Sequence, residues 1–208
     1  MSERRAGMNE RASEGQLIEA CRQGDHEAFR QLFQTYNSRV WSIALHFTGD
    51  RSMASDITQQ VFLKLFTSIG QFRHDSEFGT WLYRLVGNVC IDEERRRRRF
   101  ISLESLGLGG MGAKEKQPVK DEQRRQLQAV TQRGMQEEQC AQDEASEAVK
   151  NAVRELSPKL RMAILLKYFE GLSYEAMARV LDCSTGTVAS RLNRGHKELA
   201  RKLAHLKL

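Results

Sequence analysis

The sequence predicts an all-α protein composed of two small helical bundles joined by a flexible linker. Apolar residues recur at helical spacing over residues 14–99 and again over residues 146–208. The alternating pattern typical of β-strands is absent, and only two prolines occur in 208 residues. Residues 100–145 predict the linker, because they lack an apolar stripe, and the polar residues 1–13 predict a disordered lead.

Glycine and aspartate residues mark the ends of the first three helices. Gly24 is suited to end a short first helix, and Asp25 is suited to cap a longer second helix that ends at Gly49. Asp50 or Ser52 then begins a third helix. The helical spacing predicts that this third helix buries Met53, Ile57, Val61, Leu65 and Ile69.

A fourth helix is expected after a loop that runs from Gly70 to Gly79. It begins at about Thr80 and ends in five consecutive arginines, Arg95–Arg99. Its apolar side is expected to bury Trp81, Leu82, Leu85, Val86 and Val89. Another side carries Arg84, Asn88, Ile91, Arg95 and Arg98.

The residue types of this polar side and the loop before it suit nucleic acid. An amide such as that of Asn88 can pair with a base edge, and arginines can hold phosphates or guanine. Phe72 and Phe78 flank a polar loop that can hold an unstacked base. Each feature also has a structural explanation: Trp81 can belong to the core, Phe78 can staple the helix start, and Arg95–Arg99 can be a solvated helix end or a membrane-surface patch.

The linker prediction rests on composition. The stretch from Leu106 to Gly112 is rich in glycine, which disfavours a helix. From Ala113 to Glu147 the chain is rich in glutamine and charged residues, with acidic residues slightly in excess. This composition predicts a flexible connection that does not contact DNA along its length.

Helical periodicity returns at about Ala145. One amphipathic helix is expected first, and the pair Ser157-Pro158 then predicts the start of another, from Lys159 to Glu170, which Gly171 ends. The residues available for burial on that second helix are Leu160, Ile164, Leu165 and Tyr168.

The last two helices have the pattern of a helix-turn-helix. Ser173 and Ser184 are suited to cap them, and Asp182-Cys183 forms the turn between them. One side of the final helix is apolar, with Val188, Leu192, Leu199 and Leu203. A separate side is polar and cationic, with Thr187, Ser190, Arg191 and Arg194. That chemistry fits the major groove of DNA, and the alternative is a solvated face on an ordinary bundle.

The whole-chain composition narrows the function classes. A net charge of +6 and a pI near 9.3 favour a polyanionic partner. The four cysteines lack C-x-x-C spacing, which favours buried free thiols in a reducing, cytoplasmic location. No apolar run approaches the roughly 20 residues that span a bilayer, and the polar N-terminus predicts no secretion signal. The five histidines show no metal or triad spacing, so we expect neither cofactor, metal nor enzymatic activity.

Two separated segments resemble a known family. The segments SMASDITQQVFLKLFTSIGQF and FGTWLYRLVGNVCIDEERRRRR resemble the second conserved region of bacterial sigma factors of the sigma-70 superfamily. The segment LSPKLRMAILLKYFEGLSYEAMARVLDCSTGTVASRLNRGHKELARKL is similar to their fourth region. With only a linker between them, the two regions resemble the extracytoplasmic-function (ECF) group. Such a protein is a dissociable specificity subunit of RNA polymerase.

This resemblance implies three sets of site residues. Docking on the coiled coil of the polymerase largest subunit is implied for Asp56, Gln59, Gln60 and Lys64. Capture of the promoter −10 element is implied for Phe72, Arg73, Phe78, Trp81, Arg84, Asn88, Arg95 and Arg96. Recognition of the −35 element in the major groove is implied for Thr185, Thr187, Ser190, Arg191, Arg194 and Lys197.

The resemblance also implies further partners, and the chain departs from the family pattern at two positions. The polymerase flap and an anti-sigma factor are implied as protein partners, and promoter DNA as the nucleic acid. Gln60 stands where a glutamate is usual, and Asp182 replaces the glycine common in the turn. Aspartate tolerates a left-handed conformation at a higher cost than glycine.

Two other functions fit parts of the sequence. A stand-alone helix-turn-helix regulator would bind operator duplex without polymerase, usually as a dimer, although no apolar seam for dimerisation is evident. An RNA-binding or nucleic-acid-processing protein is compatible with the arginine run and the aromatic loop, although no metal-binding carboxylate set accompanies them.

Overall fold

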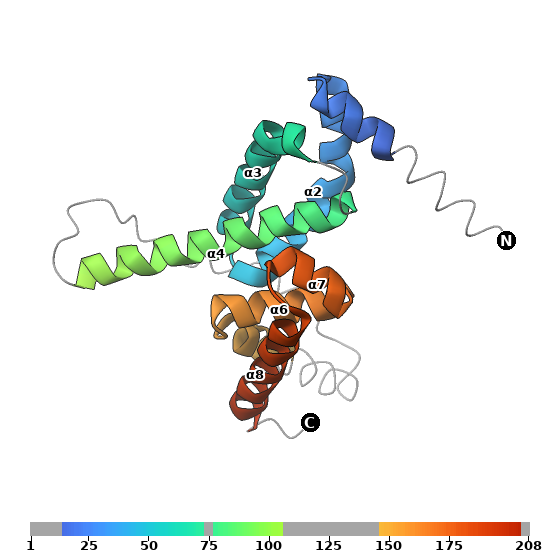
Figure 1. The fold of residues 1–208 in the computed structure, drawn as a ribbon. Coiled ribbons are helices and arrows are strands. Elements are labelled where there is room, and N and C mark those ends of the chain that lie inside the picture. Colours follow the sequence, from blue (N-terminus) through green and yellow to red (C-terminus); the bar gives the residue numbers. More distant parts are fainter. Residues whose placement is uncertain (1–13, 73–76, 106–145, 205–208) are drawn as a thin grey trace, which may run out of the picture.

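The computed structural model describes residues 14–72, 77–105 and 146–204. Every regular element within these ranges is a helix, as predicted (Figure 1). None of the described helices combines the length and the apolar character that a bilayer span requires. The predicted disordered lead and almost all of the predicted linker lie outside these ranges. We call residues 14–72 with 77–105 the N-terminal bundle, and residues 146–204 the C-terminal bundle.

The first helices of the N-terminal bundle begin and end where the capping residues predict. A helix at residues 14–22 is followed by α2, His26–Thr48, in which the Asp25 carboxylate accepts hydrogen bonds from the amides of residues 27 and 28. Gly49 ends α2 with a left-handed φ of 70°. Asp50, and not Ser52, caps α3, Arg51–Ser68, because its carboxylate accepts from the amide of residue 53 at 2.9 Å.

Helix α3 and the short turn after it bury the predicted stripe except at one end. Ile57, Val61 and Leu65 are buried in α3, and Ile69 is buried in the 3-10 helix η1, Ile69–Gln71. Met53 is only half-buried, since it lies in the first turn at the surface end of the helix.

Helix α4, Phe78–Ser105, is longer than predicted at both ends. It runs through the arginine run and out beyond the rest of the bundle (Figure 1). No glycine or proline lies between Arg99 and Ser105 to end the helix there. Within the arginine run, acidic residues one turn earlier support the helix, because they pair with arginines on the same side at i,i+3 or i,i+4 spacing. These pairs are Asp92 with Arg95, Glu93 with Arg96 and Glu94 with Arg98, at 3.7, 2.7 and 3.1 Å.

The C-terminal bundle contains a helix at residues 146–154, α6 (Pro158–Tyr168), α7 (Tyr174–Leu181) and α8 (Thr185–Leu203). The hydroxyls of Ser173 and Ser184 each accept a backbone amide at 3.2 Å, as predicted. Ser157 makes no side-chain cap, so Pro158 at the first turn begins α6 alone. Helix α6 ends two residues before the predicted Glu170.

Helix α6 is buried on all sides, which the sequence did not predict. Residues 160–166 are all buried, including Arg161. The helix contacts α2 and α4 of the N-terminal bundle as well as α7 and α8 of its own bundle, so the two bundles share one core. Tyr168, predicted to be available for burial, is 63% exposed and its hydroxyl lies 2.9 Å from His196 Nε2.

Candidate nucleic-acid interface

Helix α8 presents the predicted recognition residues on its outer side. Thr185, Ser190, Arg194 and Lys197 are exposed, while Thr187 and Arg191 are half-buried. The opposite side packs on α6, where Val188 and Leu192 are buried. Gly195 permits this close packing, because a Cβ atom there would lie 3.1 Å from Ile164 Cγ1.

The cations of this outer side do not pair with acidic residues of the described chain. Among the described residues, no carboxylate lies within ion-pair distance of Arg191, Arg194 or Lys197. The guanidinium of Arg191 is held against the turn, with Nη1 at 3.6 Å from Cys183 Sγ. The surface therefore keeps its positive charge available for an anionic ligand.

Helix α4 carries the second predicted surface. Arg84, Asn88, Arg95 and Arg96 are all exposed, and Ile91 between them is half-buried. Unlike the cations of α8, these arginines have carboxylate partners. The acidic residues directly before the arginine run could have indicated the partners of Arg95 and Arg96, whereas the partner of Arg84 is the distant Asp182. Exposed pairs of this kind contribute about 1 kcal/mol or less, so a phosphate can replace the carboxylate at low cost.

The predicted aromatic loop differs from the expectation. Phe72 and Phe78 are buried, at 3% and 2% exposure, and their ring centroids lie 5.6 Å apart in an edge-on contact. Both rings also contact the half-buried Trp81, and Phe78 contacts Tyr36. The two phenylalanine faces are therefore occupied by core contacts and are unavailable for stacking on a base. Arg73 lies outside the described residues.

The predicted docking residues lie together on the surface of α3. Asp56, Gln59 and Lys64 are exposed, and Gln60 is half-buried. Gln59 also borders an apolar groove of about 470 Å³ between α2 and α3. The sequence analysis missed this groove, whose exposed apolar residues are Phe33, Leu63 and Phe66. Leu63 and Phe66 lie off the buried stripe of α3, and this offset was the signal that could have revealed them.

The described cysteines do not form a common site. Cys21 and Cys90 are buried free thiols, as predicted, Cys183 is half-buried, and Cys140 lies outside the described residues. Burial raises the pKa of the Cys90 thiol to about 12, and the nearby Arg161 opposes that shift. Within the described ranges, no group of histidine, cysteine or acidic residues could hold a metal ion.

Comparison with known proteins decides the family. Residues 32–100 match the family model described as Sigma-70 region 2, and residues 146–199 match the one described as Sigma-70, region 4. The RNA polymerase sigma-H factor of Pseudomonas aeruginosa is 31% identical over 192 residues, which cover 92% of this chain and 94% of that protein. The ECF RNA polymerase sigma-E factor of Escherichia coli is 30% identical over 209 residues, which cover 96% of this chain and 98% of that protein. The chain belongs to the ECF sigma factors of the sigma-70 family.

Solved structures share the fold of this ECF sigma factor. CnrH, in complex with the cytosolic domain of CnrY, aligns with a TM-score of 0.60 at 20% identity and covers 92% of this chain and 97% of that chain. The sigma factor RpoE of Bartonella quintana, in complex with the anti-sigma factor NepR, aligns with a TM-score of 0.56 at 21% identity and covers 86% and 98%. The family resemblance and the predicted all-α fold are thus confirmed, and the protein acts as an RNA polymerase sigma factor in transcription initiation.

Proposed function

We propose that this sigma factor contacts the −35 element as duplex DNA through α8 and captures the −10 element through α4. The observation that carries the proposal is the outer side of α8, where exposed polar residues and three cations have no acidic partner among the described residues. Such a helix can donate hydrogen bonds to guanine and to phosphates in a major groove. The −35 contacts are Thr185, Thr187, Ser190, Arg191, Arg194 and Lys197.

Helix α4 contributes the contacts to the −10 element. Asn88 is exposed on the same side as Arg84 and Arg95, so its amide can pair with a base edge while the arginines hold the backbone. Trp81, half-buried beside the loop, and Arg73 within it complete the base site. Phe72 and Phe78 act indirectly in this proposal, because their buried rings pack against Trp81 and support its position.

Helix α3 provides the surface for core polymerase. The groove beside Gln59 exposes apolar side chains, with Leu63 at 59% and Phe66 at 49% exposure, and Asp56 and Lys64 supply charge on the same helix. An exposed apolar groove with a polar rim suits an amphipathic helix, which fits the coiled coil of the largest subunit. The flap is the contact that we propose for the C-terminal bundle.

The remaining features of the proposal concern location and regulation. The protein acts in the cytoplasm, without a cofactor and without catalysing a reaction of its own. Two relatives of similar fold are bound to the cytosolic domain of CnrY or to the anti-sigma factor NepR, so an anti-sigma factor is a further proposed partner.

Reconstitution with core polymerase tests this function. The purified protein is mixed with core enzyme and genomic DNA fragments, and the transcripts are mapped to their start sites. We expect transcripts that require the protein and share two sequence elements upstream of their starts. Tight binding to a symmetric duplex with no polymerase-dependent transcript would instead favour a stand-alone regulator.

A further inference from the structure

A pocket of about 420 Å³ lies where the end of α2 meets the first helix of the C-terminal bundle. Its walls come from four elements, which are the end of α2, the start of α3, the helix at residues 146–154 and α6. Ligand pockets usually have about 300–1,000 Å³, so this pocket can hold a small organic molecule. Its lining residues belong neither to the proposed DNA surfaces nor to the proposed docking groove.

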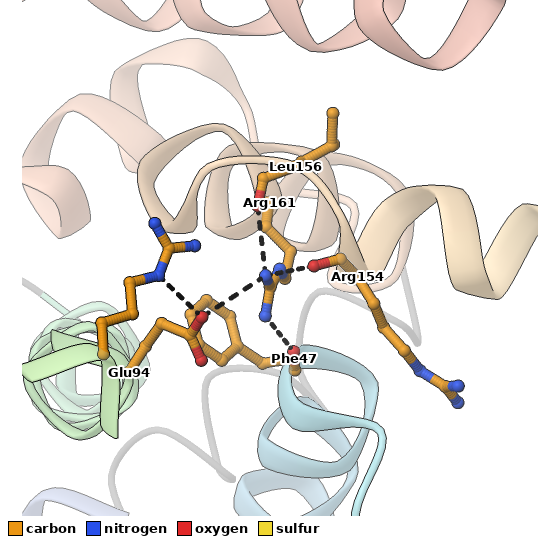
Figure 2. A network of polar contacts seen from close by, with 6 residues as sticks. Phe47, Glu94, Arg154, Leu156 and Arg161 are labelled. Carbon is orange, nitrogen blue, oxygen red and sulfur yellow. Dashed lines mark hydrogen bonds and ion pairs between the residues drawn. The ribbon is translucent and has the colours of Figure 1, made fainter. Parts of the chain in front are cut away.

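The frame of the pocket is held by the buried Arg161 of α6. Its guanidinium donates to the carbonyl oxygen of Phe47, near the end of α2, at 2.7 Å. It also donates to the carbonyl oxygens of Arg154 and Leu156, at and just after the end of the helix at residues 146–154 (Figure 2). The last carbonyls of a helix need partners from outside it, and here one cation binds those of both helices that border the pocket.

Two other arginines supply positive charge at the pocket. In Figure 2 the side chain of Arg154 extends away from the Arg161 guanidinium, and it borders the pocket. It packs over Gly49, where a Cβ atom would overlap it. Arg51, at the first position of α3, is the second and is exposed. Among the described residues, neither Arg51 nor Arg154 has a carboxylate within ion-pair distance, so both charges remain available for an anion.

The other charged residues of the pocket neutralise each other. Lys150 pairs at 2.7 Å with Glu147, the one carboxylate among the described residues that line the pocket. The lining therefore carries a net positive charge through Arg51 and Arg154. A guanidinium can bind a carboxylate with two parallel hydrogen bonds, so this pair of arginines suits a carboxylate ligand.

Much of the remaining lining is apolar or aromatic. Val149 and Phe169 are 38% and 55% exposed, which leaves apolar surface open at the pocket. The ring centroid of Phe169 also lies 4.3 Å from that of His46, so the two rings form an aromatic wall. The other apolar lining residues are Leu45, Val153 and Leu165. Apolar walls beside two unpaired cations are the chemistry that recognises an anion with an apolar body.

We propose that this pocket binds a small carboxylate with an aromatic or branched aliphatic body. The carboxylate binds Arg51 and Arg154, and the body lies against Val149 and Phe169. The groove between α2 and α3 has a similar size, but none of its described lining residues is charged, so it offers no partner for a carboxylate. The site adds ligand binding to the activity of this sigma factor and does not depend on which helix contacts DNA.

Equilibrium dialysis of the full-length protein against two probes tests the proposal. The probes are 2-naphthoate and the neutral 2-naphthalenemethanol, which share a bicyclic body and differ in the carboxylate. The charge variant is Arg51→Gln combined with Arg154→Gln. Its matched control is Arg30→Gln combined with Arg201→Gln, which changes the net charge equally at exposed positions outside the pocket.

Two further variants locate the bound probe. Val149→Trp fills the pocket with a large ring from a position exposed enough to leave the core unchanged. Leu63→Ala removes apolar surface from the groove between α2 and α3. Circular dichroism of every variant shows whether the fold is kept, and if Val149→Trp does not fold, the charge variant and its control decide.

We expect the wild type to bind 2-naphthoate about tenfold more tightly than the neutral probe, as one charge-assisted hydrogen bond provides. The charge variant should lose this preference and bind the neutral probe as the wild type does. Val149→Trp should bind neither probe, whereas the control pair and Leu63→Ala should match the wild type.

Three results would overturn the inference. The first is no saturable binding of 2-naphthoate up to about 1 mM, or equal affinity of the wild type for both probes. The second is an equal loss of 2-naphthoate binding in the charge variant and in its control pair, which would reflect net charge alone. The third is loss of binding in Leu63→Ala with full binding in a folded Val149→Trp, because the probe would then occupy the groove.

Discussion

Arg191 and Arg194 lie on the same side of α8, but only the first is partly buried. Arg191 is half-buried against Cys183, whereas Arg194 is exposed with its Nε 3.4 Å from the carbonyl of Ser190. Changing either to alanine should weaken binding of holoenzyme to the −35 duplex by about 1–3 kcal/mol if the arginine binds a base edge, and should relax sequence preference there. The control is Arg201→Ala, in the last turn of the same helix.

Anisotropy titrations with a duplex that carries the mapped −35 element, and with point variants of it, provide the measurement. Identical affinity and promoter choice in Arg191→Ala, Arg194→Ala and the control would remove α8 as the recognition helix.

The Cys90 thiol gives a pH dependence with a definite sign. Burial raises its pKa from 9.0 to about 12 in the folded protein, so the unfolded chain loses this proton at lower pH than the folded one. The stabilisation is therefore complete below pH 9.0 and is lost as the pH rises toward about 12.

Urea unfolding of the wild type and of Cys90→Ala at several pH values measures this effect. Because the alanine variant lacks the titrating thiol, the stability advantage of the wild type should shrink as the pH rises above 9.0. The native thiol should also resist alkylation until the protein unfolds. A constant difference in unfolding free energy across this range would show that the thiol is not buried as described.

At the scale of elements, α3 carries its buried apolar residues on one side and the proposed docking residues on another. The buried side packs on α2 and α4, and the exposed side holds Asp56, Gln59 and Lys64 beside the groove at Leu63. The double variant Asp56→Lys with Gln59→Lys should keep the fold and abolish co-purification with core polymerase. It replaces an acidic side chain and an amide of the proposed contact with two long, positively charged side chains. Leu63→Asp should have the same effect through the groove.

Glu19→Lys with Gln16→Lys, an equal charge change at the same i,i+3 spacing on the exposed side of the first helix, is the control for this experiment. Co-purification yields and circular dichroism are compared across the set. Normal yields for both the charge variants and Leu63→Asp would exclude α3 as the docking surface.

The ends of helices could be predicted where a nearby side chain caps the helix, and less well where no such cap is present. The positions of Asp25, Gly49, Ser173 and Ser184 predicted the beginnings or ends of α2, α7 and α8 correctly, because each cap is satisfied by residues within a few positions. The extension of α4 to Ser105 lies in a stretch without glycine, proline or a capping residue to mark its end.

At the scale of the molecule, sequence patterns could predict the two bundles but not their mutual contact. The interface depends on pairs far apart in the chain, such as Arg39 or Tyr83 with Glu170, and no periodicity links their positions. The same contact explains why α6 is buried all round and not amphipathic. The burial of Phe72 and Phe78 inside the N-terminal bundle could not be predicted either, since a loop aromatic is equally compatible with stacking on a base and with packing in a core.

The central claim is that one chain contacts promoter DNA in two states, paired at the −35 element and unpaired at the −10 element. The direct measurement is the affinity of holoenzyme for two versions of a mapped promoter, one fully paired and one with mismatches that keep the −10 element open. With the open version, the holoenzyme does not need to unpair and unstack the −10 base, which otherwise costs a few kcal/mol. We therefore expect tighter binding to the open version. Asn88→Ala should lose most of that preference and leave affinity for the paired version unchanged. Equal affinity of wild-type holoenzyme for both versions, or an equal loss on both in Asn88→Ala, would contradict the account.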